Sequence, residues 1–360
     1  MARSLGIEAS ALQIGLNPAL TADLPDITAL RREHLQLSDR WDDDAYLRWR
    51  YRLGRISGGF GDLWCLRARG QLLAIIGAEE LHADLDGRQL HGAQVMDLLV
   101  RPEAQESGVG VWLNQAMMER YDFTLAVGSN HNSAGIVRRL FKPLAPRLTF
   151  THPLDMTPFV RRRWPALAAA PLAMRLGNAG LALRRLALHS RRPRGLVLEN
   201  ATRLDAQQPV PGPRDPSCVR LLHHHAYLQE RLLHNPRRHL AVRVARRRGE
   251  VVGLIAWSVK TDDQGRRELH VVDWHHDQPD TLLGLLDAAV REAALQGCTC
   301  VRLMLQDKES QRTAARAGFL RSHLDEGRLC GVQSRDPALA TRLAQSGWSL
   351  TDLSDDSDGY

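Results

Sequence analysis

Six residues, Gln105 to Gly110, have the sequence Gln-Glu-Ser-Gly-Val-Gly and join an apolar, strand-like run to an amphipathic, helix-like run. A glycine-rich turn in this place can present backbone N–H groups to a phosphate, because no Cβ stands in the way and the helix start adds partial positive charge. The loop is neither a Walker loop nor the G-x-G-x-x-G of a dinucleotide fold. It indicates a phosphate-binding turn, although an ordinary strand-to-helix turn could have the same composition.

The elements that would position this loop recur later in the chain. Four weak matches occur in one order and at nearly one spacing: Tyr46 with Tyr227 (offset 181), Gly70 with Gly249 (179), Asp97 with Asp273 (176) and Phe141 with Phe319 (178). A common order and spacing indicate a duplicated unit better than any single match does.

Each unit has the residue pattern of an α/β domain. In the first unit we expect strands at 64–68, 72–79, 95–100 and 123–127, and helices at 27–37, 109–120 and 133–140. In the second unit we expect strands at 240–245, 251–259, 268–274 and 300–305. The predicted fold class is therefore α/β (α+β), with two tandem units, each a central mixed β-sheet flanked by helices. The predicted limits are 1–158 for the unit with the glycine loop, 159–195 for a linker, 196–353 for the second unit and 354–360 for an acidic tail.

Length and composition agree with two globular domains in a reducing compartment. The chain has 360 residues, of which 44% are hydrophobic and 25% charged. Its net charge of +7 favours an anionic partner without choosing among phosphate ligands, nucleic acid and acidic membranes. The five cysteines are too few for a disulfide framework, and Cys298-Thr-Cys300 lacks a second pair for zinc. The start of the chain resembles no signal peptide, so we expect a cytoplasmic protein without a metal.

The predicted linker is basic. Residues 161 to 194 include nine arginines and no acid, while Leu172, Leu176, Ala179, Leu183 and Leu186 recur at helical spacing. Such a helix can pack its leucines on one domain, bind an acidic partner or lie on an anionic membrane through Arg161 to Arg194. Its internal arginines exclude a comfortable membrane span.

Residues 96–113, MDLLVRPEAQESGVGVWL, resemble the acyl-CoA-binding segment of the GNAT superfamily, the Gcn5-related N-acetyltransferases. In that family a strand ends in Val-x-Pro and leads into Gln/Arg-x-x-Gly-x-Gly/Ala. Residues 125–141, LAVGSNHNSAGIVRRLF, resemble the strand and helix that follow. The likeness spans both units and is greatest to tandem GNAT proteins of the envelope-polysaccharide acyltransferase type, but only the first unit carries the specific motif.

The resemblance implies an acyl-CoA-dependent N-acyltransferase that uses acetyl-CoA or another acyl-CoA and no metal. The acceptor would be a small-molecule amine, such as an amino sugar or a precursor of the cell envelope or of a secondary metabolite, and no nucleic acid is expected. The residues implied to bind the cofactor are Leu98, Leu99, Val100, Gln105, Glu106, Ser107, Gly108, Val109, Gly110 and Asn130.

Direct attack by an amine on a thioester requires removal of a proton. Asp97 on the cofactor strand is the predicted general base, a structural aspartate being the alternative, with Glu79 and His91 in reserve. Many relatives have a Tyr after the Asn as proton donor to the thiolate. Arg138 and Arg139 stand there instead, which leaves the general acid open.

The second unit lacks the glycine loop and is interpreted as a degenerate copy that shapes the acceptor pocket. Two other functions stay open: a non-catalytic GNAT-fold binding protein, and a Fem-type transferase that uses aminoacyl-tRNA. The intact phosphate loop is an argument against the latter.

Overall fold

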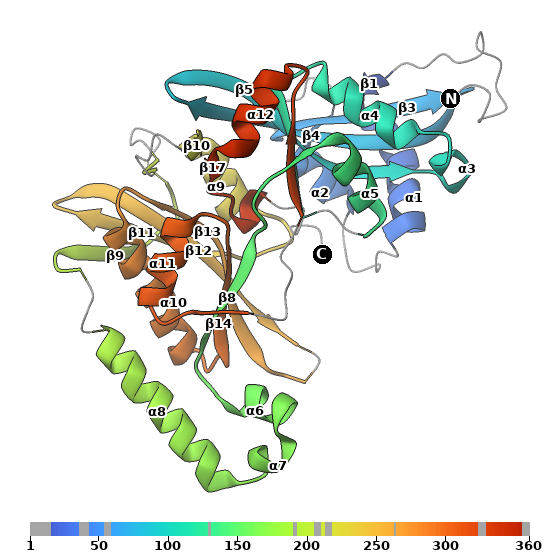
Figure 1. Ribbon diagram of the computed structural model, residues 1–360. Helices are drawn as coiled ribbons and strands as arrows, with labels where there is room; N and C mark the ends of the chain where they lie inside the picture. The colour runs from blue at the N-terminus through green and yellow to red at the C-terminus, as the bar shows by residue number, and fades with distance from the viewer. Residues whose placement is uncertain are drawn as a thin grey trace.

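Two mixed β-sheets with helices on their faces make up the chain (Figure 1). The computed structural model describes residues 16–35, 43–53, 59–128, 131–189, 193–204, 210–212, 218–262, 264–322 and 329–354. Asn130 and all but the first residue of the predicted acidic tail, 354–360, lie outside these ranges.

The first sheet has the strand order β1-β3-β4-β5-β6-β16-β7. Its strands are β1 (Leu16–Pro18), β3 (Gly61–Ala68), β4 (Gln71–Leu85), β5 (Arg88–Val100), β6 (Phe123–Val127), β16 (Cys330–Gln333) and β7 (Lys142–Pro143), and the short strands β2 (Tyr51–Arg52), β10 (Cys218–Leu221) and β17 (Gly347–Trp348) extend it.

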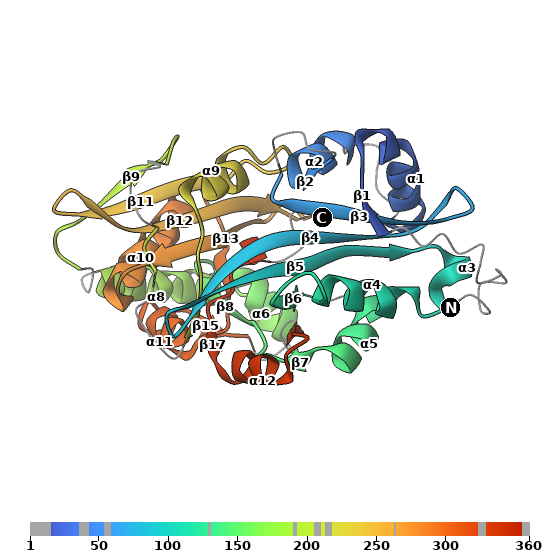
Figure 2. The same ribbon diagram turned by 90° about the horizontal axis from the view of Figure 1, so that it is seen from above.

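Helices cover both faces of this sheet, as Figure 2 shows. On one face, α1 (Leu24–Leu35) and α2 (Asp43–Arg50) bury their apolar residues in a core with Leu63, Ile75 and Met96. On the other, α4 (Val109–Met118) packs on Leu66, Ala74 and Ile76, while α3 (Pro102–Gln105) and α5 (His131–Leu140) flank it. Apolar residues alternate along β3 and β4 and so supply both cores.

The second sheet has the order β15-β8-β14-β13-β12-β11-β9. Its strands are β15 (Leu320–Arg321), β8 (Leu148–Pro153), β14 (Cys300–Leu305), β13 (Arg267–His276), β12 (Glu250–Thr261), β11 (Ala241–Arg247) and β9 (Leu196–Asn200). The helices of this half are α9 (His225–Leu233), α10 (Pro279–Leu295) and α11 (Lys308–Arg316), and α12 (Pro337–Gln345) follows β16.

The two halves exchange strands. β8 precedes the linker but pairs with β14 in the second sheet, whereas β16 comes from the second half and pairs with β6 in the first. On its far edge β8 pairs with β15, and β16 pairs with β7. The short strands β10 and β17, which extend the first sheet, also come from the second half. The predicted boundaries of 1–158 and 196–353 therefore do not coincide with the sheets at these four strands.

The fold class predicted from the sequence is confirmed, and the predicted strands at 123–127 and 300–305 match β6 and β14 residue for residue. β4 and β5 are longer than predicted, because they continue to a two-residue hairpin at Asp86 and Gly87. Both turn residues have positive φ, 53° and 79°, which is the geometry that an Asp-Gly turn favours.

The linker forms three helices, α6 (Thr157–Arg163), α7 (Pro165–Ala168) and α8 (Pro171–His189), which project from one end of the molecule (Figure 1). One side of α8 contacts the chain beside the second sheet: Asn178 hydrogen-bonds Asp155, two residues after β8, and Arg184 donates to the Gly318 carbonyl. The predicted leucine stripe does not pack, since Leu172, Leu176, Leu183 and Leu186 are 64–71% exposed. The interpretation that these leucines pack on a domain is thus wrong.

Candidate functional site

The site lies where two neighbouring strands of the first sheet separate. β5 and β6 are parallel and pair at only three positions, from Gly92 with Phe123 to Gln94 with Leu125. Beyond Gln94, β5 continues to Val100 with β4 on one edge, while its other edge has no strand partner among the described residues. A cavity of about 500 Å³ occupies this gap.

The walls of the cavity come from both faces of the sheet. They include β5, the start of α4, the end of β6, the exposed turn after it, α5 and one residue of α1: His34, Ile76, Val95, Met96, Asp97, Leu98, Leu99, Val100, Gln105, Gly108, Gly110, Val111, Asn114, Ala126, Val127, Gly128, Ser133, Ile136 and Val137. A cavity lined by both apolar and polar groups, beside the separated strands, suits a ligand with an extended arm and a charged group.

Two glycines shape the start of α4. Gly108 is the N-cap and has φ 81°, a conformation that glycine adopts without strain, and a Cβ there would meet no atom within 4 Å. At Gly110 a Cβ would come to 3.0 Å from Cδ1 of Ile136, so this glycine lets α5 approach α4. The first-turn amides of α4 have no partners within the helix, and Gly108, Gly110 and Val111 of this turn line the cavity.

Most of the predicted cofactor residues meet at this cavity. Leu98, Leu99, Val100, Gln105, Gly108 and Gly110 line it, whereas Glu106, Ser107 and Val109 do not. The predicted catalytic residue Asp97 also lines it. The side chains of the loop brace its backbone: Gln105 Nε2 donates to the Val100 carbonyl at 3.1 Å, and Ser107 Oγ donates to the Ala104 carbonyl at 2.6 Å.

A β-bulge determines where Asp97 points. The register between β4 and β5 shifts between Ile75 and Gly77, so that two residues, Asp97 and Leu98, lie opposite one. Asp97 has φ 47°, a left-handed conformation that Asp tolerates better than most residues. As a result Asp97 turns toward α1 and α2, while Leu98 faces α4.

Asp97 is buried, and both of its carboxylate oxygens accept hydrogen bonds. Arg31 Nη1 donates to its Oδ1 at 2.5 Å, and the Tyr51 hydroxyl donates to its Oδ2 at 2.5 Å. Burial by itself would raise the pKa of this carboxyl, but the Arg31 charge and the Tyr51 hydrogen bond outweigh burial and hold the pKa below its ordinary value. A carboxylate that already accepts two buried hydrogen bonds and has a lowered pKa is a poor proton acceptor. This geometry argues against Asp97 as the general base, and that role stays a prediction.

The two residues held in reserve lie away from the cavity walls. Glu79 is buried, forms an ion pair with Arg50 at 2.8 Å and accepts a hydrogen bond from Tyr227 at 2.5 Å. His91 is exposed and stacks on His82. Arg50 and Arg231, which match in the duplicated units, both lie against Glu79, so this carboxylate joins the two halves.

His34 on α1 was missed in the sequence, and it is the single histidine among the residues that line the cavity. Its Nε2 is buried and has no hydrogen-bond partner in the described part of the chain. Imidazole is the side chain that most often transfers protons in enzymes at neutral pH. No sequence pattern indicates this role, because His34 lies more than sixty residues before the loop and only the packing of α1 brings it to the cavity.

No group of His, Cys, Asp or Glu side chains within the described ranges is arranged to hold a metal ion.

Solved structures share the fold of this chain at low sequence identity. The chain matches a GCN5-related N-acetyltransferase from Anabaena variabilis with TM-score 0.59 and 9% identity, over 89% of this chain and 72% of that one. It matches another from Kribbella flavida with TM-score 0.55 and 14% identity, over 92% and 74%. It also matches Saccharomyces cerevisiae N-myristoyltransferase with bound myristoyl-CoA, with TM-score 0.53 and 10% identity, over 94% and 89%. No protein-family model and no curated protein matches the sequence.

The chain thus has the fold of the GCN5-related N-acetyltransferases, as the glycine loop and the strand before it predicted. Its two sheets extend that fold over both halves.

Proposed function

We propose that this protein is an acyl-CoA-dependent N-acyltransferase whose cofactor occupies the cavity between β5 and β6. The observation that carries the proposal is the open β5 edge beside a glycine-capped helix start. Pantetheine amides can pair with the backbone of residues 98 to 100, as a further strand would. The amides of residues 108 to 110 can hold the pyrophosphate, helped by the partial positive charge of α4.

In the proposed reaction the amine nitrogen of the acceptor attacks the thioester carbonyl carbon, the C–S bond breaks, and CoA leaves as the thiolate. The nitrogen must lose one proton along this path. We assign that proton to His34 Nε2, because it lies in the wall of the cavity and has no competing partner among the described residues. Asp97 then serves to hold Arg31 and Tyr51 at the bulge.

The acceptor that we propose is a small-molecule amine, such as an amino sugar or a precursor of the cell envelope or of a secondary metabolite. The acyl chain is acetyl or longer. The fold neighbours support acyl transfer in general, since one of them is an N-myristoyltransferase with bound myristoyl-CoA. Release of CoA from a series of acyl-CoAs, measured with a thiol reagent against a panel of amines, identifies both substrates.

We expect Gly108→Glu to abolish CoA binding. The change forces a non-glycine residue into φ 81° and places a negative charge where the pyrophosphate would lie. Calorimetry with CoA should show a loss of affinity of at least about a hundredfold, the order of a few charge-assisted hydrogen bonds.

The matched control is Gly70→Glu. Gly70 has φ 80° in the hairpin between β3 and β4, and a Cβ there also meets no atom within 4 Å. This variant has the same backbone strain and the same charge but lies outside the cavity, and it should bind CoA as the wild type does. A folded Gly108→Glu protein with unchanged affinity would place the cofactor elsewhere.

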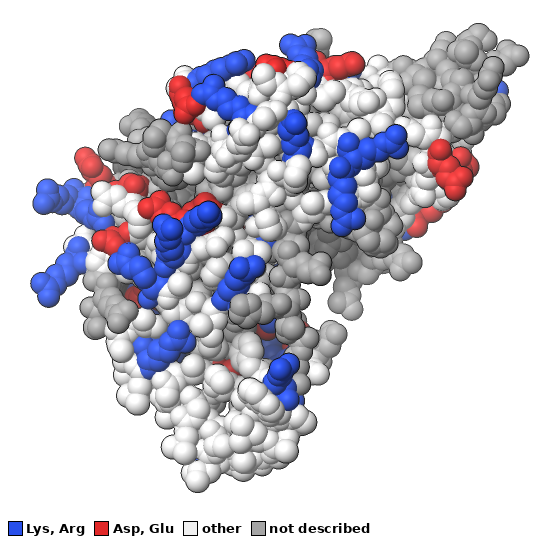
Figure 3. Space-filling view, in the orientation of Figure 1, with Lys and Arg blue, Asp and Glu red and all other residues white. Residues whose placement is uncertain are grey.

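We also propose that α6 to α8 rest on an anionic membrane surface, with the protein located in the cytoplasm. The described residues include eleven large hydrophobic side chains that are exposed. Seven of them lie in this segment: Phe159, Trp164, Leu167, Leu172, Leu176, Leu183 and Leu186. Figure 3 shows this end of the molecule as mainly uncharged surface with basic side chains next to it. No helix among the described residues is long and apolar enough to cross a bilayer.

Charge supports a membrane as the partner. At 100° per residue, Leu172, Leu176, Leu183 and Leu186 share one face of α8, and Arg175 lies at the edge of that face. Apolar side chains with arginine beside them suit the boundary between acyl chains and anionic headgroups. Another protein surface would need its own acidic rim around an apolar groove to fit equally well.

Replacing Leu176 and Leu183 with Glu should lower binding to phosphatidylglycerol vesicles at least about tenfold, because buried apolar area is lost and negative charge is added. Sedimentation with vesicles measures this, and Leu295→Glu, at a residue 84% exposed on α10, is the control. A wild-type protein that leaves such vesicles unbound at low salt rules out this surface as a membrane contact.

A further inference from the structure

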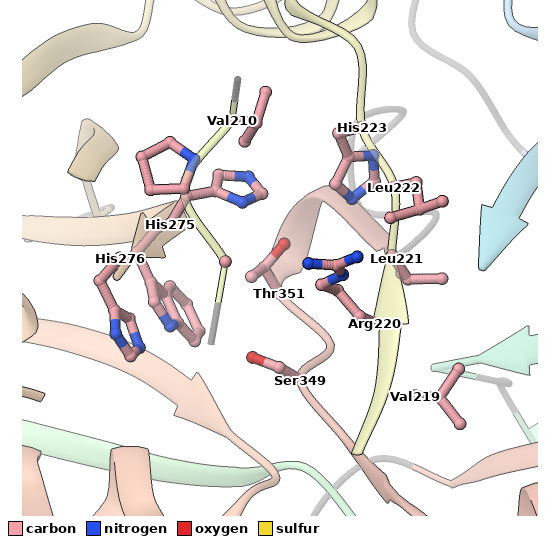
Figure 4. A pocket seen from close by; sticks show the side chains of 13 residues that line it. Val210, Val219, Arg220, Leu221, Leu222, His223, His275, His276, Ser349 and Thr351 are labelled. Atoms are coloured by element: carbon pink, nitrogen blue, oxygen red, sulfur yellow. The ribbon is translucent and has the colours of Figure 1, made fainter. Parts of the chain in front are cut away.

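A second cavity, of about 280 Å³, lies between β10 and the carboxyl end of β13, and all the residues that line it belong to the second half of the chain (Figure 4). Its walls are Val210 to Gly212, β10 with the two residues after it, the carboxyl end of β13, and Ser349 and Thr351. It shares no residue with the cavity of the first sheet. Its function is therefore a separate question from acyl transfer.

The polar groups that face this cavity are mainly hydrogen-bond donors. Figure 4 shows the Arg220 guanidinium beside the Thr351 hydroxyl, with Ser349 below them and the rings of His223 and His275 turned to the same space. Arg220 forms no ion pair with any described residue, and no Asp or Glu is among the residues that line the cavity. A guanidinium without a carboxylate partner is the group that binds carboxylates and phosphates in two-point contacts.

Buried polar atoms at the wall have no partner either. The indole Nε1 of Trp274 and Nδ1 of His276 are buried and make no hydrogen bond within the described part of the chain. Both residues line the cavity and are at least nine-tenths buried. Both atoms are themselves covered by neighbouring atoms, so they make this wall polar, and the groups open to a ligand are Arg220, Ser349 and the imidazoles of His223 and His275.

Neighbouring groups determine the ring position of His275 and the protonation of His223. His275 Nε2 lies 3.0 Å from Oδ2 of Asp273, whose carboxylate is buried. That contact fixes the ring and leaves Nδ1 for a ligand. Burial lowers the pKa of His223 to about 3, with the neighbouring His275 adding to the effect, so the His223 ring is neutral at physiological pH. Arg220 is then the fixed positive charge, and the imidazoles supply hydrogen bonds.

We propose that this cavity binds a small hydroxylated molecule that carries a carboxylate or a phosphate. The anionic group contacts Arg220 and Ser349, and the ligand hydroxyls contact His223 and His275. The volume is at the low end of the range for small-molecule pockets, about 300–1,000 Å³, which limits the ligand to a few carbons. In the duplicated unit Asp273 matches Asp97, so the second half keeps a buried aspartate at this strand but uses it to orient a histidine.

The test follows the Trp274 indole N–H in an NMR titration of the full chain, with that resonance assigned by Trp274→Phe. Inorganic phosphate, glycerol 3-phosphate and malate are the probes, with sodium chloride at matched ionic strength as reference. We expect a saturable shift with at least one probe. Comparison of malate with glycerol 3-phosphate tells whether a carboxylate or a phosphate is preferred.

Arg220→Gln should weaken that binding at least about tenfold, since a charge-assisted contact is lost. Arg335→Gln, which removes an exposed arginine outside the cavity, should leave it unchanged. Ser349→Ala gives a second, smaller loss and serves if Arg220→Gln does not fold. Absence of a saturable shift with every probe, or a shift that neither variant weakens, would show that the cavity holds water only and would overturn the proposal. CoA binding by the first sheet is measured in parallel and is expected to stay the same in all these variants.

Discussion

His34→Gln should lower turnover by about a hundredfold or more while leaving the affinity for CoA unchanged. The side chain lines the cavity at the separated strands, and its buried Nε2 has no partner among the described residues. Glutamine keeps the polarity and approximate size of the side chain but cannot take a proton, and proton transfer by a positioned side chain contributes about 10²–10⁴-fold. Steady-state kinetics of CoA release give turnover, and calorimetry gives the affinity.

The pH dependence separates this role from a structural one. A higher pH supplies more acceptor already deprotonated, so the deficit of His34→Gln should shrink as the pH rises through the pKa of the acceptor amine. His91→Gln is the matched control, because His91 is exposed and outside the cavity walls. Full turnover of His34→Gln at neutral pH would exclude His34 and return the proton to Asp97 or to water.

The sequence allowed much of the fold to be predicted. The glycine loop, the strand before it and the four matched positions were sufficient for two α/β halves, because these signals are local or repeat at one spacing. The strands at 123–127 and 300–305 were predicted correctly, since each is a short, mainly apolar run between polar segments. Elements with local patterns of this kind form in the folded chain where the sequence predicts them.

Long-range pairings could not be predicted in this way. The exchange of β8 and β16 depends on which sheet edge is open, and no pattern within either strand records that. The linker shows the same limit: its leucine spacing indicated an apolar face, but whether the face would be covered depended on the opposite side of α8, where Asn178 and Arg184 make the contacts. His34 entered the site for the same reason, through the packing of α1.

The orientation of Asp97 could not be predicted from the sequence either. Regular alternation along a strand would place Met96 and Asp97 on opposite faces. The bulge cancels this alternation, so both lie on the side of α1 and α2, where Arg31 and Tyr51 already occupy the carboxylate. Asp97, which the sequence predicted as the general base, is therefore part of a buried ion pair.

Asp97→Asn should therefore lower the free energy of unfolding by about 3–5 kcal/mol, the usual cost of removing one partner of a buried ion pair. The Arg31 guanidinium would remain buried without its counter-charge. Urea denaturation of the full chain measures the change. Asp86→Asn is the matched control: Asp86 also has positive φ, 53° against 47° for Asp97, and also pairs with an arginine, Arg342, but its side chain is 47% exposed. Asn tolerates this conformation in both places, so the control should lose less than about 1 kcal/mol.

The same pair of proteins has a pH signature. Because the folded-state pKa of Asp97 is below its ordinary value, its carboxylate stabilises the fold above about pH 4, the unfolded-state value, and that contribution fades as the pH falls toward the folded-state pKa. The difference in unfolding free energy between the wild type and Asp97→Asn should thus be constant near neutrality and shrink in acid below about pH 4. A variant that is as stable as Asp86→Asn yet a hundredfold slower in acyl transfer would instead make Asp97 the proton acceptor, because its carboxylate would then matter to the reaction and not to the fold.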